Sequence, residues 1–78
     1  MAHDHPEIML DLSGLLCPLP VLKVRKRLIE MAPGSVLVVT ATDPMAAIDI
    51  PHFCNEQGHV LESKSEDGNA LIFRIRRK

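Results

Sequence analysis

A cysteine followed by alternating prolines, Cys17-Pro18-Leu19-Pro20, is the part of the chain best suited to chemistry. Proline is favoured at the first position of a helix, because the N–H that it lacks is not needed there. The tetrapeptide therefore predicts that Pro18 is the first helical residue and that Cys17 is the N-cap. A helix N-terminus carries partial positive charge, which favours the thiolate, the reactive form of cysteine. We predict a lowered pKa and a nucleophilic, catalytic role for Cys17.

The two prolines are expected to support this site. Pro18 and Pro20 each remove one N–H donor at the start of the helix and restrict its backbone. We expect the Cys17 sulfur to meet few, rigidly placed N–H groups and to face outward, and those groups would favour an anion on the sulfur. The alternative for Cys17 is a small buried apolar residue, which its place at a predicted helix start disfavours.

The segments around this cysteine predict a strand, a helix and a second strand. Residues 8–12 alternate well enough for a strand. In residues 21–31 the apolar side chains gather on one side of a helical wheel, which is typical of an amphipathic helix. Pro33-Gly34 ends this helix, and the apolar run 36–39 is typical of a strand inside a sheet. The order strand, helix, strand predicts a crossover between parallel strands.

The second half of the chain predicts another helix and a hairpin. Asp43 is a favourable N-cap, and Pro44 suits the first helical position. Pro51 lies inside this helix, where we expect a kink or break. Gly58 suits the C-terminal cap, and residues 66–69 predict a hairpin turn between two final strands. The order βαβαββ predicts an α/β fold of the α+β two-layer kind: a four-stranded mixed sheet with both helices on one face.

Composition indicates one small domain that keeps its thiols reduced. The chain has 78 residues, a net charge of -1 and 46% hydrophobic residues. We expect residues 1–7 to form a flexible tail and residues 8–78 a single domain. The N-terminus lacks the pattern of a signal peptide, and no apolar run approaches the length of a membrane span. Two cysteines are too few for a disulfide framework, so we expect a cytoplasmic protein without a membrane partner.

Metal and nucleic-acid functions are weakly supported. The four histidines, His3, His5, His52 and His59, do not combine with the cysteines in the paired spacing of a zinc site, so we predict no metal. Residues 74–78 are mostly basic, but they lack interleaved aromatics, which disfavours direct nucleic-acid binding. Charge that protects an exposed edge strand is the simpler explanation.

Charged residues near the predicted site suggest contacts with a partner. Lys23, Arg25 and Lys26 would give the first helix a basic surface that docks an acidic partner, although a solvated helix face is the commoner explanation. Arg25 falls on the apolar side of that helix, where it would reach solvent along the core edge or pair with a carboxylate. Asp43 is first of all an N-cap, and a role in partner contact stays open.

Cys54 lies on the apolar face of the second predicted helix, beside Phe53. We favour a place in the core, because inert buried cysteine is common. The functional alternative is a resolving thiol that forms a disulfide with Cys17 or takes over its sulfur. That alternative requires Cα atoms roughly 4.4–6.8 Å apart.

Several short motifs follow one another in a characteristic order. They are Leu10-Asp11, Gly14-Leu15-Leu16-Cys17-Pro18-Leu19-Pro20, Pro33-Gly34, Thr42-Asp43-Pro44, Asp49-Ile50-Pro51, Phe53-Cys54, Gly58-His59 and Ile75-Arg76-Arg77-Lys78. In this order, from about residue 8 to the end, the chain resembles the TusA (SirA-like) family of small sulfur carriers. The resemblance implies a two-layer βαβαββ sandwich, which agrees with the order of elements predicted above.

The resemblance also implies a function for Cys17. It implies that this residue accepts sulfane sulfur as a persulfide and relays it to a partner protein, for tRNA thiolation, sulfur oxidation or cofactor assembly. The implied donor is a protein such as a cysteine desulfurase or a rhodanese. The persulfide is transient, so we expect no resident cofactor, and whether the carrier is an enzyme with sulfurtransferase activity stays open. Two alternatives remain: a thiol redox protein that uses Cys17 and Cys54, and a regulatory module that binds RNA or protein.

Overall fold

The computed structural model describes residues 7–78, so that His3, His5 and nearly all of the predicted tail lie outside the described residues. The elements follow the predicted order. They are β1 (Glu7–Leu12), α1 (Leu19–Ile29), β2 (Val36–Ala41), α2 (Ala46–Gln57), β3 (Val60–Asp67) and β4 (Ala70–Arg76).

The strands form a four-stranded sheet in the order β1-β2-β4-β3. β1 and β2 are parallel, with Ile8 opposite Leu37, whereas β2–β4 and β4–β3 are antiparallel. The mixed sheet and the parallel crossover are therefore confirmed. The tight turn between β3 and β4 contains Gly68, whose φ of 63° lies in the left-handed region that glycine adopts without strain.

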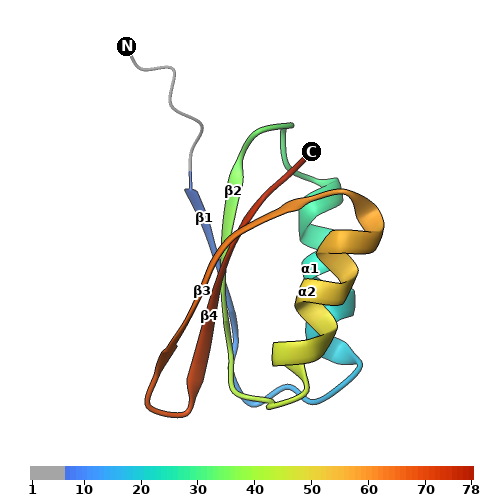
Figure 1. Cartoon of the computed structure of the whole chain (residues 1–78). Helices are drawn as coiled ribbons and strands as arrows, with labels where there is room; N and C mark the ends of the chain where they lie inside the picture. Colours follow the sequence, from blue (N-terminus) through green and yellow to red (C-terminus); the bar gives the residue numbers. More distant parts are fainter. Residues whose placement is uncertain (1–6) are drawn as a thin grey trace.

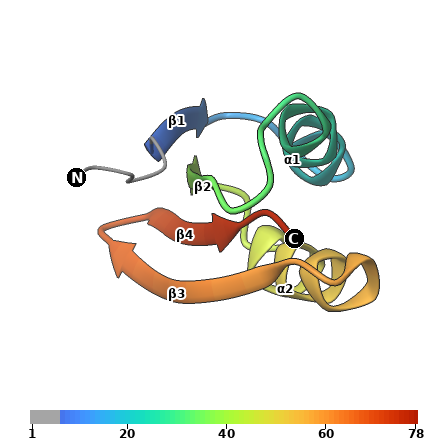
Figure 2. The same ribbon diagram turned by 90° about the horizontal axis from the view of Figure 1, so that it is seen from above.

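Both helices cover the same face of the sheet, which gives the predicted two layers (Figure 1; Figure 2). The core lies between the layers and is almost wholly aliphatic. Its buried residues come from both helices and from every strand except β3: Leu12, Val24, Leu28, Met31, Leu37, Val39, Ala41, Ala46, Ile50, Cys54, Phe73 and Ile75. Leu37, Val39, Phe73 and Ile75 sit on the two inner strands. Val36 and Val38, which alternate with the core residues of β2, are also buried, so β2 is a continuous apolar run.

Ion pairs between strands lie on the opposite face of the sheet. Arg74 contacts Glu7 at 2.6 Å, and Arg76 contacts Glu62 at 2.6 Å. β4 is an inner strand, so the prediction that its arginines protect an exposed edge is wrong. Instead the arginines cross to carboxylates on the two outer strands.

Both helices begin later than predicted. Pro18, not Cys17, is the N-cap of α1, and Met45, not Asp43, is the N-cap of α2. The amides of Ala46 and Ala47, the first two residues of α2, donate to the carbonyls of Asp43 and Pro44 at 2.9 and 3.1 Å. This tighter turn precedes the regular helix and delays its first residue.

Pro51 lies inside α2, which nevertheless continues without a break from Ala46 to Gln57. The predicted break is wrong, because one proline removes only one backbone hydrogen bond and the apolar side of the helix packs onto the sheet. Gly58 ends the helix as predicted, with a φ of 81° and its N–H bonded to the Cys54 carbonyl.

Candidate functional site

The candidate site lies at one end of the molecule, where three turns meet. The segment that joins β1 to α1, the segment that joins β2 to α2 and the β3–β4 turn all lie at the lower end in Figure 1. The first of these segments carries Cys17, which is an exposed free thiol. The predicted outward position of Cys17 is therefore confirmed.

Asp43 holds the Cys17 segment against the start of α2. One of its carboxylate oxygens accepts a 2.6 Å hydrogen bond from the Cys17 amide, and the other accepts a 3.1 Å bond from the Met45 amide. The Asp43 residue is only 7% exposed, so this carboxylate is an internal tether. A second link lies beside it, where the Gly14 amide donates to Thr42 Oγ1 at 2.8 Å.

The start of α1 offers the sulfur few N–H groups. Pro18 and Pro20 have no N–H, and the Leu19 amide donates to the Leu16 carbonyl at 2.9 Å. Residues 18–20 therefore offer no free N–H to an anion on Cys17. Pro20 is buried, whereas Pro18 is exposed. The Cys17–Pro18 peptide bond is cis.

The pKa of Cys17 is raised, so the prediction of a lowered value is wrong. The largest cause is a hydrogen bond between the Cys17 thiol and the Asp49 carboxylate; desolvation and the negative charges of Asp49 and Asp43 act in the same direction. Cys17 precedes the N-cap, which places it outside the helix end whose partial charge was expected to favour the thiolate. The carboxylates of Asp49 and Asp43, together with desolvation, therefore set the direction of the pKa shift.

Asp49 is the site residue that sequence reasoning missed. It lies in the first turn of α2, and its amide donates to the Met45 carbonyl at 2.9 Å. The available signal was its position four residues, about one helical turn, after the N-cap Met45. Nothing in the sequence showed that this carboxylate faces Cys17, because the contact joins two separate segments.

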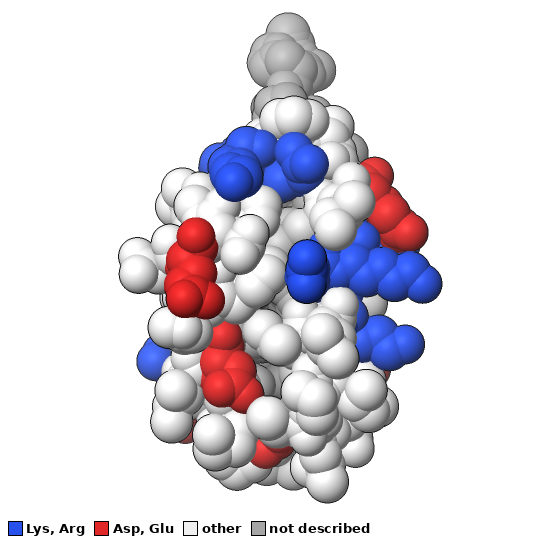
Figure 3. All heavy atoms as spheres, turned by 90° about the vertical axis from the view of Figure 1, so that its right-hand side faces the viewer, with Lys and Arg blue, Asp and Glu red and all other residues white. Residues whose placement is uncertain are grey.

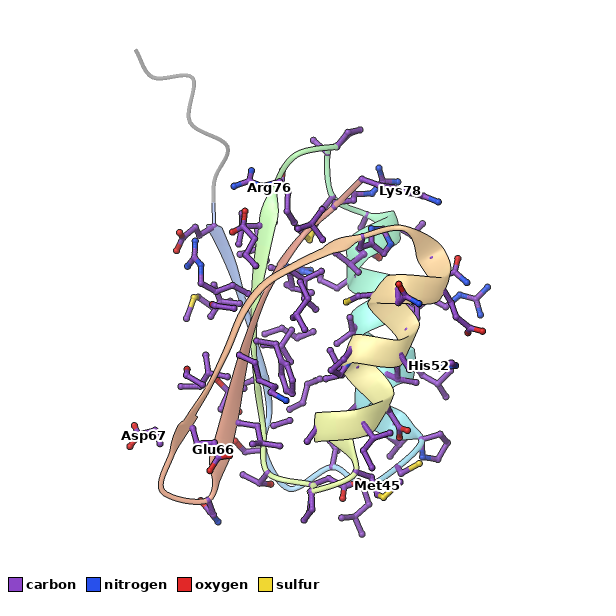
Figure 4. All side chains as sticks on the ribbon, viewed as in Figure 1. Met45, His52, Glu66, Asp67, Arg76 and Lys78 are labelled. Atoms are coloured by element: carbon purple, nitrogen blue, oxygen red, sulfur yellow. The ribbon has the colours of Figure 1, made fainter. Side chains whose placement is uncertain are left out.

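Exposed apolar side chains flank the cysteine in sequence and at the start of α2. Leu16 is 66% exposed, Leu19 44%, Met45 45% and Ile48 63%. Figure 4 places Met45 at the end of the molecule where α1 begins, and Figure 3 shows that this end of the helical face is mostly uncharged. We call these four residues the apolar collar. Such a group of exposed apolar side chains is typical of a surface that contacts another protein.

The predicted basic residues lie further along α1. Lys23, Arg25 and Lys26 are all exposed. Lys23 and Lys26, together with Arg27, line a groove of about 250 Å³ against Leu10 of β1. Arg25 lies on the exposed surface and not in the core. Asp43, the fourth candidate for partner contact, is buried at the tether.

Cys54 is placed where the core interpretation predicts. It is 1% exposed, and burial raises the pKa of its thiol to about 11. It follows Asp49 by five residues, which is about 7.5 Å further along the axis of α2 and away from the Cys17 end. The structure records both cysteines as free thiols.

Within residues 7–78, no three His, Cys, Asp or Glu side chains come together in a way that could hold a metal ion. In the same part of the chain, no helix has the length and apolar character needed to cross a membrane.

Comparison with known proteins identifies relatives of this fold and site. Residues 8–77 match the family described as Sulfurtransferase TusA. The chain is 42% identical over 73 residues to the Sulfur carrier protein TusA of Pseudomonas putida, covering 94% of this chain and 91% of the relative. It is 41% identical over 75 residues to the protein of the same name from Pseudomonas paraeruginosa, covering 95% of each.

Proposed function

The chain belongs to the TusA family of sulfurtransferases, and from that membership we propose that it is a sulfur carrier that works through Cys17. In this function the Cys17 sulfur accepts sulfane sulfur from a donor and passes it to an acceptor protein. The observation that carries the proposal is the exposed position of Cys17 on a tethered segment, within the residues that match the family.

The proposed chemistry needs only the thiol and its exposure. The Cys17 sulfur attacks the terminal sulfur of a donor persulfide, the donor S–S bond breaks, and a persulfide forms on Cys17. The sulfur leaves Cys17 by the same reaction in the other direction, with an acceptor thiol as the nucleophile. No resident cofactor is required, because the transferred sulfur travels on the cysteine. We place this function in the cytoplasm, where thiols stay reduced.

A protein donor, such as a cysteine desulfurase or a rhodanese, and a protein acceptor would in turn cover the apolar collar. The exposed collar supports this proposal, because the partner's sulfur must reach Cys17 between these side chains. Lys23, Arg25 and Lys26 would contact the edge of an acidic partner. Lys23→Glu should then slow loading by the protein donor and leave loading by glutathione persulfide unchanged.

Intact mass spectrometry of the reduced protein tests the carrier function. The wild type, Cys17→Ser and Cys54→Ser are each incubated with cysteine and a cysteine desulfurase, and the added mass is measured. We expect a gain of one sulfur atom, about 32 Da, in the wild type and in Cys54→Ser, and none in Cys17→Ser. If Cys17→Ser gains sulfur as readily as the wild type, Cys17 is not the carrier residue. If only Cys54→Ser loses the added mass, the sulfur is carried by the second thiol.

A further inference from the structure

We propose that the outer edge of β1 binds an extended acidic segment of a partner protein, which adds to the sheet as a further strand. This inference rests on the sulfur-carrier function proposed above and deepens its partner contact, because it names the form and the charge of what binds. Its basis is an edge strand that runs beside a groove lined mainly by cations.

β1 lies at the edge of the sheet and lacks the features that protect such edges. It pairs with β2 alone, and its register runs without interruption from Glu7 to Leu12. The strand contains no proline, lysine or bulge. In an edge strand, alternate backbone N–H and C=O groups point away from the sheet and can pair with another chain. β1 therefore offers a flat edge to an added strand.

The other edge of the sheet is built differently. β3 has a shift in register between Leu61 and Ser63, which is typical of a β-bulge. Exposed charged side chains follow on the same strand, at Lys64, Glu66 and Asp67. Bulges and charges both hinder the pairing of an edge with another chain. The contrast between the two edges singles out β1 as the one available for strand addition.

The groove beside β1 indicates the charge of the added segment. β1 and α1 lie at the same side of the molecule (Figure 2), and the groove is lined by Leu10 of β1 and by Lys23, Lys26, Arg27 and Glu30 of α1. Three of these four charged side chains are cations. Glu30 contacts Arg27 at 3.7 Å, and both side chains are exposed, so this ion pair is weak. Carboxylates on the added segment would complement the remaining positive charge.

The spacing of the cations matches that of side chains on a strand. β1 and α1 both run along the long axis of the molecule (Figure 1). On an added strand, every second side chain lies on the helical face of the sheet, and these side chains are about 6.6–6.8 Å apart. Lys23 and Arg27 are four residues apart on α1, which is about 6 Å along its axis. Two acidic residues separated by one residue would therefore face two cations.

The groove shares no residue with the apolar collar. A segment bound along β1 leaves the collar and the exposed Cys17 thiol uncovered. One partner can therefore be held at β1 while its reacting sulfur reaches Cys17 at the end of the molecule.

Fluorescence anisotropy with three labelled nine-residue peptides tests the proposal at neutral pH and about 0.15 M salt. In the first peptide, glutamate alternates with threonine, which favours strands. The second has lysine in place of glutamate. The third has the first sequence with a methyl group on every peptide nitrogen, so that it cannot donate hydrogen bonds to β1. Hydrogen exchange followed by NMR reports on the backbone amides of residues 7–12.

The matched variants are Lys26→Glu and Arg25→Glu, which reverse one charge on the same helix, inside and outside the groove. We expect the glutamate peptide to bind the wild type and to slow the exchange of alternate amides in β1. Lys26→Glu should weaken this binding by about tenfold or more, and Arg25→Glu by less than about twofold. The lysine peptide and the methylated peptide should not bind. Circular dichroism checks that both variants keep the fold.

Four results would overturn the proposal. If the wild type does not bind the glutamate peptide, the edge does not accept such a segment. If both variants weaken binding equally, the peptide responds only to overall charge, and if the methylated peptide binds equally well, no strand is added. If the same amides of β1 become protected without peptide as the protein concentration rises, the edge belongs to a second copy of this chain.

The peptide assay involves no sulfur transfer, so the two proposals can fail separately. Normal loading of Cys17 without peptide binding would overturn the role of the β1 edge alone. Peptide binding by a wild type that never carries sulfur on Cys17 would instead contradict the proposed function.

Discussion

At the scale of the residue, the site depends on where two carboxylates lie with respect to one thiol. Reactive cysteines are commonly activated by neighbouring cations or helix ends. The Cys17 amide donates to Asp43, and hydrogen bonding to Asp49, desolvation and the charges of Asp49 and Asp43 raise the pKa of the Cys17 thiol. A thiol with a raised pKa is less often in the thiolate form, on which adventitious alkylation and oxidation depend. Such protection suits a carrier with an exposed cysteine.

Asp43→Ala tests the tether. The change leaves the amides of Cys17 and Met45 without their shared acceptor, at a position that is 7% exposed. We expect the free energy of unfolding to fall by about 1–3 kcal/mol, measured by urea denaturation, together with slower loading of Cys17 by glutathione persulfide. Asp67→Ala, at the exposed end of β3, is the control and should change stability by less than about 0.5 kcal/mol. Equal stability of the two variants would show that the Asp43 bonds contribute nothing net.

At the scale of the element, each helix has exposed site residues at its start and a buried side along its length. α1 buries Pro20, Val24 and Leu28, and α2 buries Ala46, Ile50 and Cys54. The exposed apolar residues of the collar contribute little to this packing. Substitutions of the exposed collar residues should therefore alter the site with little effect on the packing of the core.

Ile48→Ser tests the collar against Ile29→Ser. Ile48 is 63% exposed beside Asp49, and Ile29 is 66% exposed at the far end of α1. We expect Ile48→Ser to slow loading by a cysteine desulfurase several-fold, because docking loses apolar area, while loading by glutathione persulfide is unchanged. Ile29→Ser should behave as the wild type in both assays. Equal rates for the two variants with the protein donor would exclude Ile48 from the docking surface.

At the scale of the whole molecule, charge and function are separated along the long axis. Met45, Glu66 and Asp67 lie toward the end that carries the site, whereas Arg76 and Lys78 lie toward the opposite end (Figure 4). The C-terminal basic residues are also used structurally, since Arg77 donates to the Leu28 carbonyl at 2.6 Å and Arg76 to the Gly34 carbonyl at 2.7 Å. These bonds join the end of the chain to the end of α1 and to the turn before β2.

The core cysteine links the stability of the whole molecule to pH. Burial raises the pKa of Cys54 from 9.0 to about 11. Because the folded value exceeds the unfolded one, the contribution of this thiol to stability is complete below the unfolded pKa and is lost as the pH rises toward the folded pKa. Across this window we expect the free energy of unfolding to fall more in the wild type than in Cys54→Ala, by on the order of 2 kcal/mol. Urea denaturation at a series of pH values measures the difference, and parallel curves would contradict it.

The sequence by itself determined the order of elements, the two layers and the identity of the exposed thiol. These follow from local signals: the period of apolar residues, the glycine at the end of α2, the turn after β3 and the prolines after Cys17. The continuous apolar run of β2 indicated an inner strand, because an inner strand is flanked by neighbours that bury its side chains on both faces, and Val36 and Val38 are indeed only 4% and 8% exposed. Such signals act within a few residues of one another, so they can be read without knowing the fold.

Only the tertiary structure decided the electrostatics of the site. The helix start predicted a thiolate, but the Asp49 carboxylate, which lies 32 residues after Cys17, reversed the direction of the pKa shift. The tether from Asp43 and the inner position of β4 were likewise decided by which segments meet. Charge interactions depend on distance in space. That distance is set by packing between helices and sheet, which no local pattern in the chain records.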